Sequence, residues 1–210
     1  MIAMIISAVV AAVQGIGGPS EERTADIECV YEYRTSDDKG REDVYSTILQ
    51  VGKRSAKFVD YSTFQLDSAR TSGASEDQVE AFRLREEKKA QYFDYAIFQN
   101  EPAGNMTVYG TIISDRYSYT EDSKAMKWTL ADDEKTICGY QCHKAECEYG
   151  GRKWTAWYSQ DIPVSYGPWK LCGLPGLILA AEDSDGANKF EAIILRNGAS
   201  AITPVSDKNI

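Results

Sequence analysis

The stretch 169–179, with the sequence WKLCGLPGLIL, decides the fold of this 210-residue chain. Its centre, LPGL, is predicted to form a type II turn, because proline presets φ near about −65° and glycine supplies the positive φ that this turn needs. Gly173, Pro175 and Gly176 are therefore expected to be structural turn residues. The apolar run from Leu177 to Ala181 is predicted to leave the turn as a buried strand.

Most of the chain on either side of this turn has the pattern of β-strands. In residues 26–35, Ile27, Cys29, Tyr31 and Tyr33 would lie on one face of a strand and Glu28 and Glu32 on the other, which is typical of a half-buried strand. Short segments rich in Gly, Asp and Ser, which are typical of turns, separate the other candidate strands. Strands are expected at residues 26–35, 43–51, 55–61, 106–113, 115–120, 126–130, 135–149, 153–159, 177–182 and 189–196.

One segment, Ser75 to Gln91, has a different composition, with charged and straight-chain residues and neither Gly nor Pro. Ser75 and Gln78 have the spacing of a capping box, which marks the start of a helix. The sequence therefore predicts one surface helix beside an antiparallel sheet. This combination is an α+β fold, mainly antiparallel β.

The charge of the chain excludes some partners. The formal net charge is −9, no run of five basic residues occurs, and every charged residue lies at or beyond Glu21. Nucleic acid and anionic membranes attract basic proteins, so neither is an expected partner.

The first thirteen residues, Met1 to Val13, are an uncharged run that is apolar except at Ser7, and the Gly-rich stretch 14–19 follows it. A helix of that length rises about 20 Å, which is too short for a bilayer core of about 30 Å. We interpret residues 1–15 as a signal peptide and residues 16–210 as a single β-rich domain, with no transmembrane segment after cleavage. The expected location is periplasmic or extracellular.

The five cysteines of an exported chain favour disulfides, and their odd number leaves at least one unpaired within the monomer. On one continuous strand Cys138 and Cys142 would lie about 13 Å apart, too far to bond. The bridges to test are Cys142–Cys172 and a bond from Cys29 to a downstream cysteine. The spacing of the cysteines around His143 does not match a structural zinc site, so no metal is predicted.

The sequence contains none of the common catalytic or phosphate-binding motifs. No catalytic residue and no cofactor is therefore assigned. A hydrolase that uses His143 or a pair of carboxylates stays open as an alternative, as does a metal or redox protein that uses the cysteines. The run Asp183-Ser184-Asp185-Gly186 is interpreted as a hairpin turn, because it lacks the length of a calcium loop.

Aromatic residues gather close to the turn. In a strand, Trp154 and Tyr158 would share one face and Trp157 the other, so one set can pack the core while the other lines a concave surface. Such a surface could take a sugar, a peptide or a lipid. The predicted ligand-binding residues are Trp154, Trp157, Tyr158, Tyr166 and Trp169.

The string GLPGLI at residues 173–178 resembles the signature of the GLPGLI family, and residues 133–135, 139–145, 151–158 and 161–170 resemble the family segments before it. That family consists of secreted Bacteroidetes proteins, most without an assigned activity. The chain is also similar to the bowl-like domain that precedes the catalytic part of a secreted peptide N-glycanase. The resemblance implies a curved, half-open sheet or partial barrel with one surface helix.

Together these observations favour an exported envelope protein that binds a hydrophobic, glycan or protein ligand without catalysing a reaction. The partner would be this unknown ligand or another envelope protein.

Overall fold

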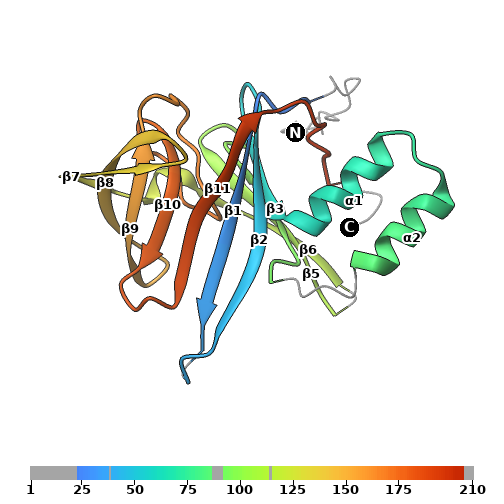
Figure 1. The fold of residues 1–210 in the computed structure, drawn as a ribbon, viewed down its shortest axis with the longest axis horizontal. Helices are drawn as coiled ribbons and strands as arrows, with labels where there is room; N and C mark the ends of the chain where they lie inside the picture. The colour runs from blue at the N-terminus through green and yellow to red at the C-terminus, as the bar shows by residue number, and fades with distance from the viewer. Residues whose placement is uncertain (1–22, 38, 87–91, 114, 206–210) are drawn as a thin grey trace, which may run out of the picture.

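The computed structural model describes residues 23–37, 39–86, 92–113 and 115–205, and its main feature is one antiparallel sheet of eleven strands (Figure 1). The strands are β1 (Ile27–Ser36), β2 (Glu42–Val51), β3 (Ala56–Asp60), β4 (Ala96–Gln99), β5 (Asn105–Ile112), β6 (Asp115–Asp122), β7 (Thr129–Ile137), β8 (Tyr140–Tyr149), β9 (Arg152–Ser159), β10 (Leu177–Asp183) and β11 (Asn188–Asn197). Their order across the sheet is β6-β5-β4-β3-β2-β1-β11-β10-β9-β8-β7, so β6 and β7 are the edge strands.

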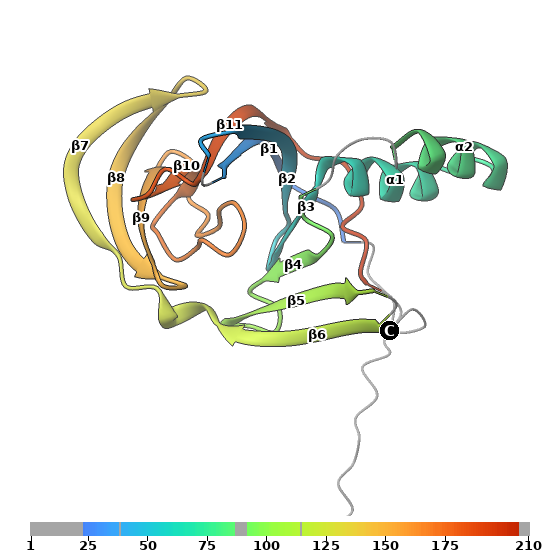
Figure 2. The ribbon, with the colours of Figure 1, turned by 90° about the horizontal axis from the view of Figure 1, so that it is seen from below.

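The sheet bends strongly around its own interior. Figure 2 shows β7, β8 and β9 curving round on one side while β4, β5 and β6 close in from the other. Register shifts at Val30/Tyr31 and Ile178/Ala180 interrupt the pairing of central strands, and such bulges bend a strand. The short helix η1 (Ser123–Ala125) carries the chain from one edge strand to the other. The predicted antiparallel, half-open sheet is confirmed.

The two faces of this sheet bury cores of different size. Inside the bend, Tyr31, Phe58 and Phe190 belong to a large aromatic and aliphatic cluster that includes most of the buried residues. Outside the bend a much smaller cluster is centred on Ile48 and Phe64. The concave face therefore contains the main core, and the convex face is only partly covered.

Two α-helices, not the single helix predicted, lie among the described residues. Helix α1 (Tyr61–Thr71) begins where the Asp60 side chain accepts a hydrogen bond from the Ser62 backbone N–H. It packs on the convex side of β2 and β3 (Figure 2). Sequence reasoning extended strand β3 to Tyr61 and missed α1.

Helix α2 (Glu76–Glu86) confirms the predicted helix and its capping box. The Ser75 backbone N–H donates to Gln78 Oε1 at 2.9 Å, and the Gln78 N–H donates to Ser75 Oγ at 3.3 Å. The rest of the predicted helix, residues 87–91, lies outside the described residues.

One predicted strand is divided in the structure. Residues 135–149 form two strands, β7 and β8, joined at Cys138 and Gly139, which both have positive φ (50° and 83°). Two consecutive positive φ values are the requirement of a tight type I′ hairpin turn. The strand predicted at 126–130 also differs, because regular pairing begins only at Thr129.

In the described part of the chain no helix is long and apolar enough to cross a membrane. The predicted signal peptide, residues 1–15, lies outside the described residues.

Candidate functional site

The loop between β9 and β10, residues 160–176, lies inside the bend of the sheet (Figure 2). We call it the interior loop. It contributes Ile162, Leu171 and Leu174 to the main core. Buried Gln99 of β4 anchors it, because its Nε2 donates to the carbonyl oxygens of Gly167 (2.8 Å) and Trp169 (2.7 Å). The chain's own loop therefore fills much of the concave face, and an open trough there is not available to a ligand.

The signature bend at the end of this loop does not have the predicted geometry. Gly176 does not have a φ in the left-handed range, so the type II turn is wrong. Glycine is required there for another reason, because a Cβ would lie 2.1 Å from the Ser159 carbonyl oxygen. The left-handed conformation occurs instead at Gly173, with φ 94°. Pro175 lies between the two glycines in the bend.

The predicted aromatic residues take different places. Trp154 and Tyr158 face the interior and are buried in the main core. Trp157 lies on the opposite face of β9, with Lys135 Nζ 4.5 Å from its ring centroid. Half-buried Tyr166 donates its hydroxyl to the Arg54 carbonyl at 2.9 Å. Trp169, the last of the five, lines a pocket at the edge of the sheet's interior.

This pocket, which we call the mouth pocket, has a volume of about 420 Å³. It lies where the end of β6, helix η1, the β8–β9 turn and the interior loop meet. Its lining residues are Glu121, Asp122, Ala125, Tyr149, Gly150, Trp169 and Lys170.

Trp169 has an unusual backbone, with φ 53°, the left-handed conformation that costs a bulky residue energy. Its ring is half-buried and packs against Trp154 and Tyr149, with centroids 5.6 and 5.8 Å away. The indole N–H donates to the Tyr95 hydroxyl at 3.2 Å. The surrounding contacts therefore hold this tryptophan in one orientation at the pocket wall.

Beside the tryptophan, Lys170 forms a partly buried charged network. Its Nζ donates to Glu121 Oε1 at 2.7 Å and to the Tyr119 hydroxyl at 3.0 Å. The Tyr149 hydroxyl donates to the other oxygen of Glu121 at 2.7 Å. The pocket wall thus carries polar groups in fixed positions.

The same contacts control the charges. Burial by itself would raise the pKa of Glu121, but hydrogen bonds from Lys170 and Tyr149 bring that pKa below its ordinary value. Burial would lower the pKa of Lys170, and the bonds to Glu121 and Tyr119 raise it overall. Both groups are therefore charged near neutral pH, which suits a binding role more than proton transfer.

Sequence reasoning found Trp169 but missed Glu121, Tyr149 and Lys170. Lys170 follows Trp169 directly, which was a usable signal. Glu121 and Tyr149 belong to β6 and β8, and only the bend of the sheet brings them to Lys170.

All five cysteines have free thiols in the structure, so the predicted Cys142–Cys172 bridge is absent. Cys142 and Cys147 are both buried in the main core. Burial raises the pKa of the Cys172 thiol to about 12 and that of Cys147 to about 11. These thiols are therefore protonated at neutral pH and weakly reactive.

The other candidates for chemistry lie apart from the mouth pocket. His143 Nδ1 is 3.4 Å from Glu134 Oε1 on the neighbouring strand. Within the described ranges, no three His, Cys, Asp or Glu residues are placed to hold a metal ion. The Asp183–Gly186 run forms the predicted turn between β10 and β11, and Asp183 pairs with Arg152 at 2.6 Å.

Comparison with known proteins gives a short family match. Residues 150–180, which contain the interior loop, match the model of a family described as "Protein of unknown function (Porph_ging)". No curated protein matches the chain. The GLPGLI family predicted from the sequence was not itself found, and the matched segment covers only a small part of the chain.

Solved structures give a fold-level match. Two crystal forms of PNGF-II each align with a TM-score of 0.55 and 15% identity, covering 89% of this chain. The chain spans only about 30% of the length of PNGF-II. LolA superfamily protein NE2245 from Nitrosomonas europaea aligns over 90% of both chains, with 10% identity and a TM-score of 0.33. The likeness to PNGF-II shows a shared fold and no more.

Proposed function

We propose that this chain is an exported, non-enzymatic binding module whose mouth pocket takes a carbohydrate. The observation that carries this proposal is Trp169, which is held in a strained backbone conformation at the wall of the pocket. Strain of this kind is concentrated at functional sites, because the rest of the structure must stabilise it.

The chemistry of the pocket matches a sugar better than a purely apolar ligand. A sugar ring has an apolar C–H face that can pack on an aromatic ring, and hydroxyl groups at its rim that need hydrogen-bond partners. The mouth pocket offers Trp169 and Tyr149 for the first, and Glu121, Asp122 and Lys170 for the second. Its volume of about 420 Å³ falls within the usual range for small-molecule sites.

Two comparisons support the wider assignment. The family match at residues 150–180 includes the GLPGLI string, which supports membership of the GLPGLI family. The fold shared with PNGF-II is compatible with the bowl-like domain that the sequence resembles. Export to the periplasm or cell surface follows from this family assignment, and cleavage near residue 15 is part of the proposal.

Glycan-array screening followed by calorimetry on the best oligosaccharide tests the proposal. We expect Trp169→Ala to weaken binding at least about tenfold, because buried aromatic anchors supply much of the binding energy of such sites. Trp157→Ala is the matched control, since it removes the same side chain from the opposite face of β9 and should leave binding unchanged.

A second variant covers the case in which Trp169→Ala disturbs the loop. Glu121→Gln retains the size of the side chain and changes its charge, so it should weaken sugar binding while circular dichroism stays unchanged. An array without any bound glycan, or equal losses in the Trp169 and Trp157 variants, would refute the carbohydrate proposal. If the protein binds an apolar probe with an affinity that Glu121→Gln leaves unchanged, a hydrophobic ligand would be favoured.

A further inference from the structure

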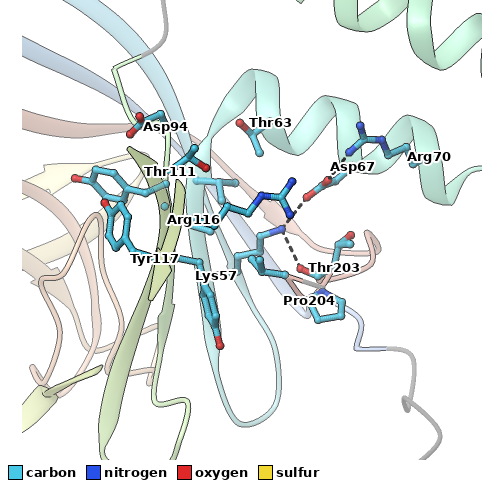
Figure 3. Close-up of a pocket in the computed structure, with 16 residues that line it drawn as sticks. Lys57, Thr63, Asp67, Arg70, Asp94, Thr111, Arg116, Tyr117, Thr203 and Pro204 are labelled. Carbon is cyan, nitrogen blue, oxygen red and sulfur yellow. Dashed lines mark hydrogen bonds and ion pairs between the residues drawn. The ribbon is translucent and has the colours of Figure 1, made fainter. Parts of the chain in front are cut away.

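A second pocket lies on the convex side of the sheet, away from the mouth pocket. It has a volume of about 370 Å³ and is bounded by β3, β4, β5, β6, helix α1 and the segment after β11 (Figure 3). We call it the convex pocket. No aromatic residue that the sequence singled out lines it.

The base of the convex pocket contains a buried lysine. The Lys57 side chain is 3% exposed, and its Nζ donates to Asp67 Oδ2 (2.8 Å) and to the Thr203 carbonyl oxygen (3.0 Å). Asp67 Oδ1 also forms a longer ion pair with Arg70 Nη1, at 3.8 Å. One carboxylate is therefore shared by two cations at this end of the pocket.

A third cation adds to this excess. Arg116 of β6 points into the pocket on the side of the Lys57–Asp67 pair (Figure 3). It forms no hydrogen bond or ion pair with any residue in the described part of the chain. Asp94, the other acidic lining residue, lies toward the opposite end of the pocket (Figure 3). The chain as a whole has a formal net charge of −9, so this local excess of positive charge is opposite in sign to the charge of the whole chain.

The convex pocket also contains an unused hydroxyl group. Thr203 Oγ1 is buried and has no hydrogen-bond partner among the residues described. A buried polar atom without a partner is unfavourable, and a bound ligand can supply the missing hydrogen bond. The remaining walls include Val59, Ala96 and Pro204, which offer apolar contact.

From this arrangement we infer that the convex pocket binds a small organic anion, with a carboxylate or phosphate group at Arg116 and Arg70 and an apolar body against Val59, Ala96 and Pro204. A guanidinium presents paired N–H donors that match either anion in a two-point contact. The inference is independent of the mouth pocket, because no lining residue is common to the two pockets.

Calorimetry on the purified protein with three probes of equal chain length tests the inference. Octanoate and octyl phosphate carry the two possible anions, and 1-octanol carries the same apolar body without charge. We expect at least one of the two anions to bind, and 1-octanol to bind at least about tenfold more weakly. The stronger anion identifies which head group the pocket prefers.

Variants locate the site. Arg116→Gln should weaken binding of the better anion at least about tenfold, since Arg116 has no structural partner to lose. Arg41→Gln is the matched control, because it changes the net charge equally at the far β1–β2 turn, where Arg41 pairs with Asp37. Failure of both anions to bind would overturn the inference. An affinity that Arg116→Gln leaves unchanged, or that Arg41→Gln reduces equally, would also overturn it.

Discussion

The concave and convex faces of the sheet bury polar side chains in opposite ways. On the concave face, Gln99 is fully buried, and its side-chain amide donates hydrogen bonds to the backbone of the interior loop. On the convex face, Glu28, Gln50 and Lys57 lie directly opposite one another on β1, β2 and β3 and are buried beneath the segment after β11. Gln99 on the concave face therefore makes neutral hydrogen bonds, whereas Glu28 and Lys57 on the convex face also form ion pairs, with Arg196 and Asp67.

This difference separates stability from binding. The interior loop and its aromatic neighbours form the main core, so few interior residues are free to meet a ligand. Both pockets lie at the limits of that core, one at the mouth and one beneath α1. Changes inside the bend should therefore affect folding, and changes at the two pockets should affect binding.

The largest effect is expected for Gly176→Ala. The new Cβ would meet the Ser159 backbone at 2.1 Å, and backbone cannot move aside as a flexible side chain can. We expect a loss of about 3 kcal/mol or more in the free energy of unfolding, measured by urea denaturation. Gly40→Ala is the control, because a Cβ there meets nothing and only its positive φ is penalised, by about 1 kcal/mol. Equal losses would show that the loop is not packed as described.

The stability losses of two glutamine variants, one on each face, give a direct comparison of the faces. Gln99→Ala leaves the Gly167 and Trp169 carbonyls without their donor, and we expect a loss of about 3 kcal/mol. Gln50→Ala removes bonds to Ser200 and Ala201 near the end of the chain, and should cost about 1 kcal/mol. Denaturation measures both losses, and hydrogen exchange should show the interior loop opening only in the Gln99 variant. A larger loss at Gln50 would reverse the proposed roles of the faces.

The pH dependence of stability should come from carboxylates on both faces. Burial alone would raise the pKa of Glu28, but hydrogen bonds from Ser200 and Arg196 lower it overall from its ordinary value of 4.5. A lowered pKa in the folded state contributes stability that is present above about pH 4.5 and is lost as the pH falls through the folded value. Glu121 at the mouth pocket is shifted in the same direction.

The measurement is urea denaturation of wild type, Glu28→Gln and Glu121→Gln between neutral and acidic pH. Each variant should be less stable than wild type at pH 7, and the gap should close below about pH 4.5. A gap that persists in acid would mean that packing, not charge, accounts for the loss.

The sequence predicted those structural features that depend on residues close together in the chain. Ser75 and Gln78 are three residues apart, and their capping box was found where the sequence placed it. Helix α1 was missed because its start depends on Asp60, the last residue of the buried strand β3, and its Ser- and Thr-rich sequence has little helical periodicity.

Features that depend on contacts between residues far apart in the sequence could not be predicted. The β7–β8 turn places Cys138 at positive φ, which its residue type does not suggest. The mouth pocket joins Glu121 to Lys170, 49 positions apart, and only the closure of the bent sheet brings them together. The convex pocket likewise depends on α1, which the sequence analysis did not find.

The smallest effect, on reactivity and not on stability, concerns the difference between one exposed cysteine and the four cysteines of the main core. Cys138 is exposed in its hairpin turn, whereas Cys29, Cys142, Cys147 and Cys172 are buried. Native protein treated with iodoacetamide should be modified at Cys138 first, and faster as the pH rises toward its raised pKa. Peptide mass spectrometry after unfolding in urea should show all five alkylated without a reductant. If Cys142 and Cys172 instead required reduction, the bridge predicted from the sequence would form in solution, and the interior loop would have to shift to make it.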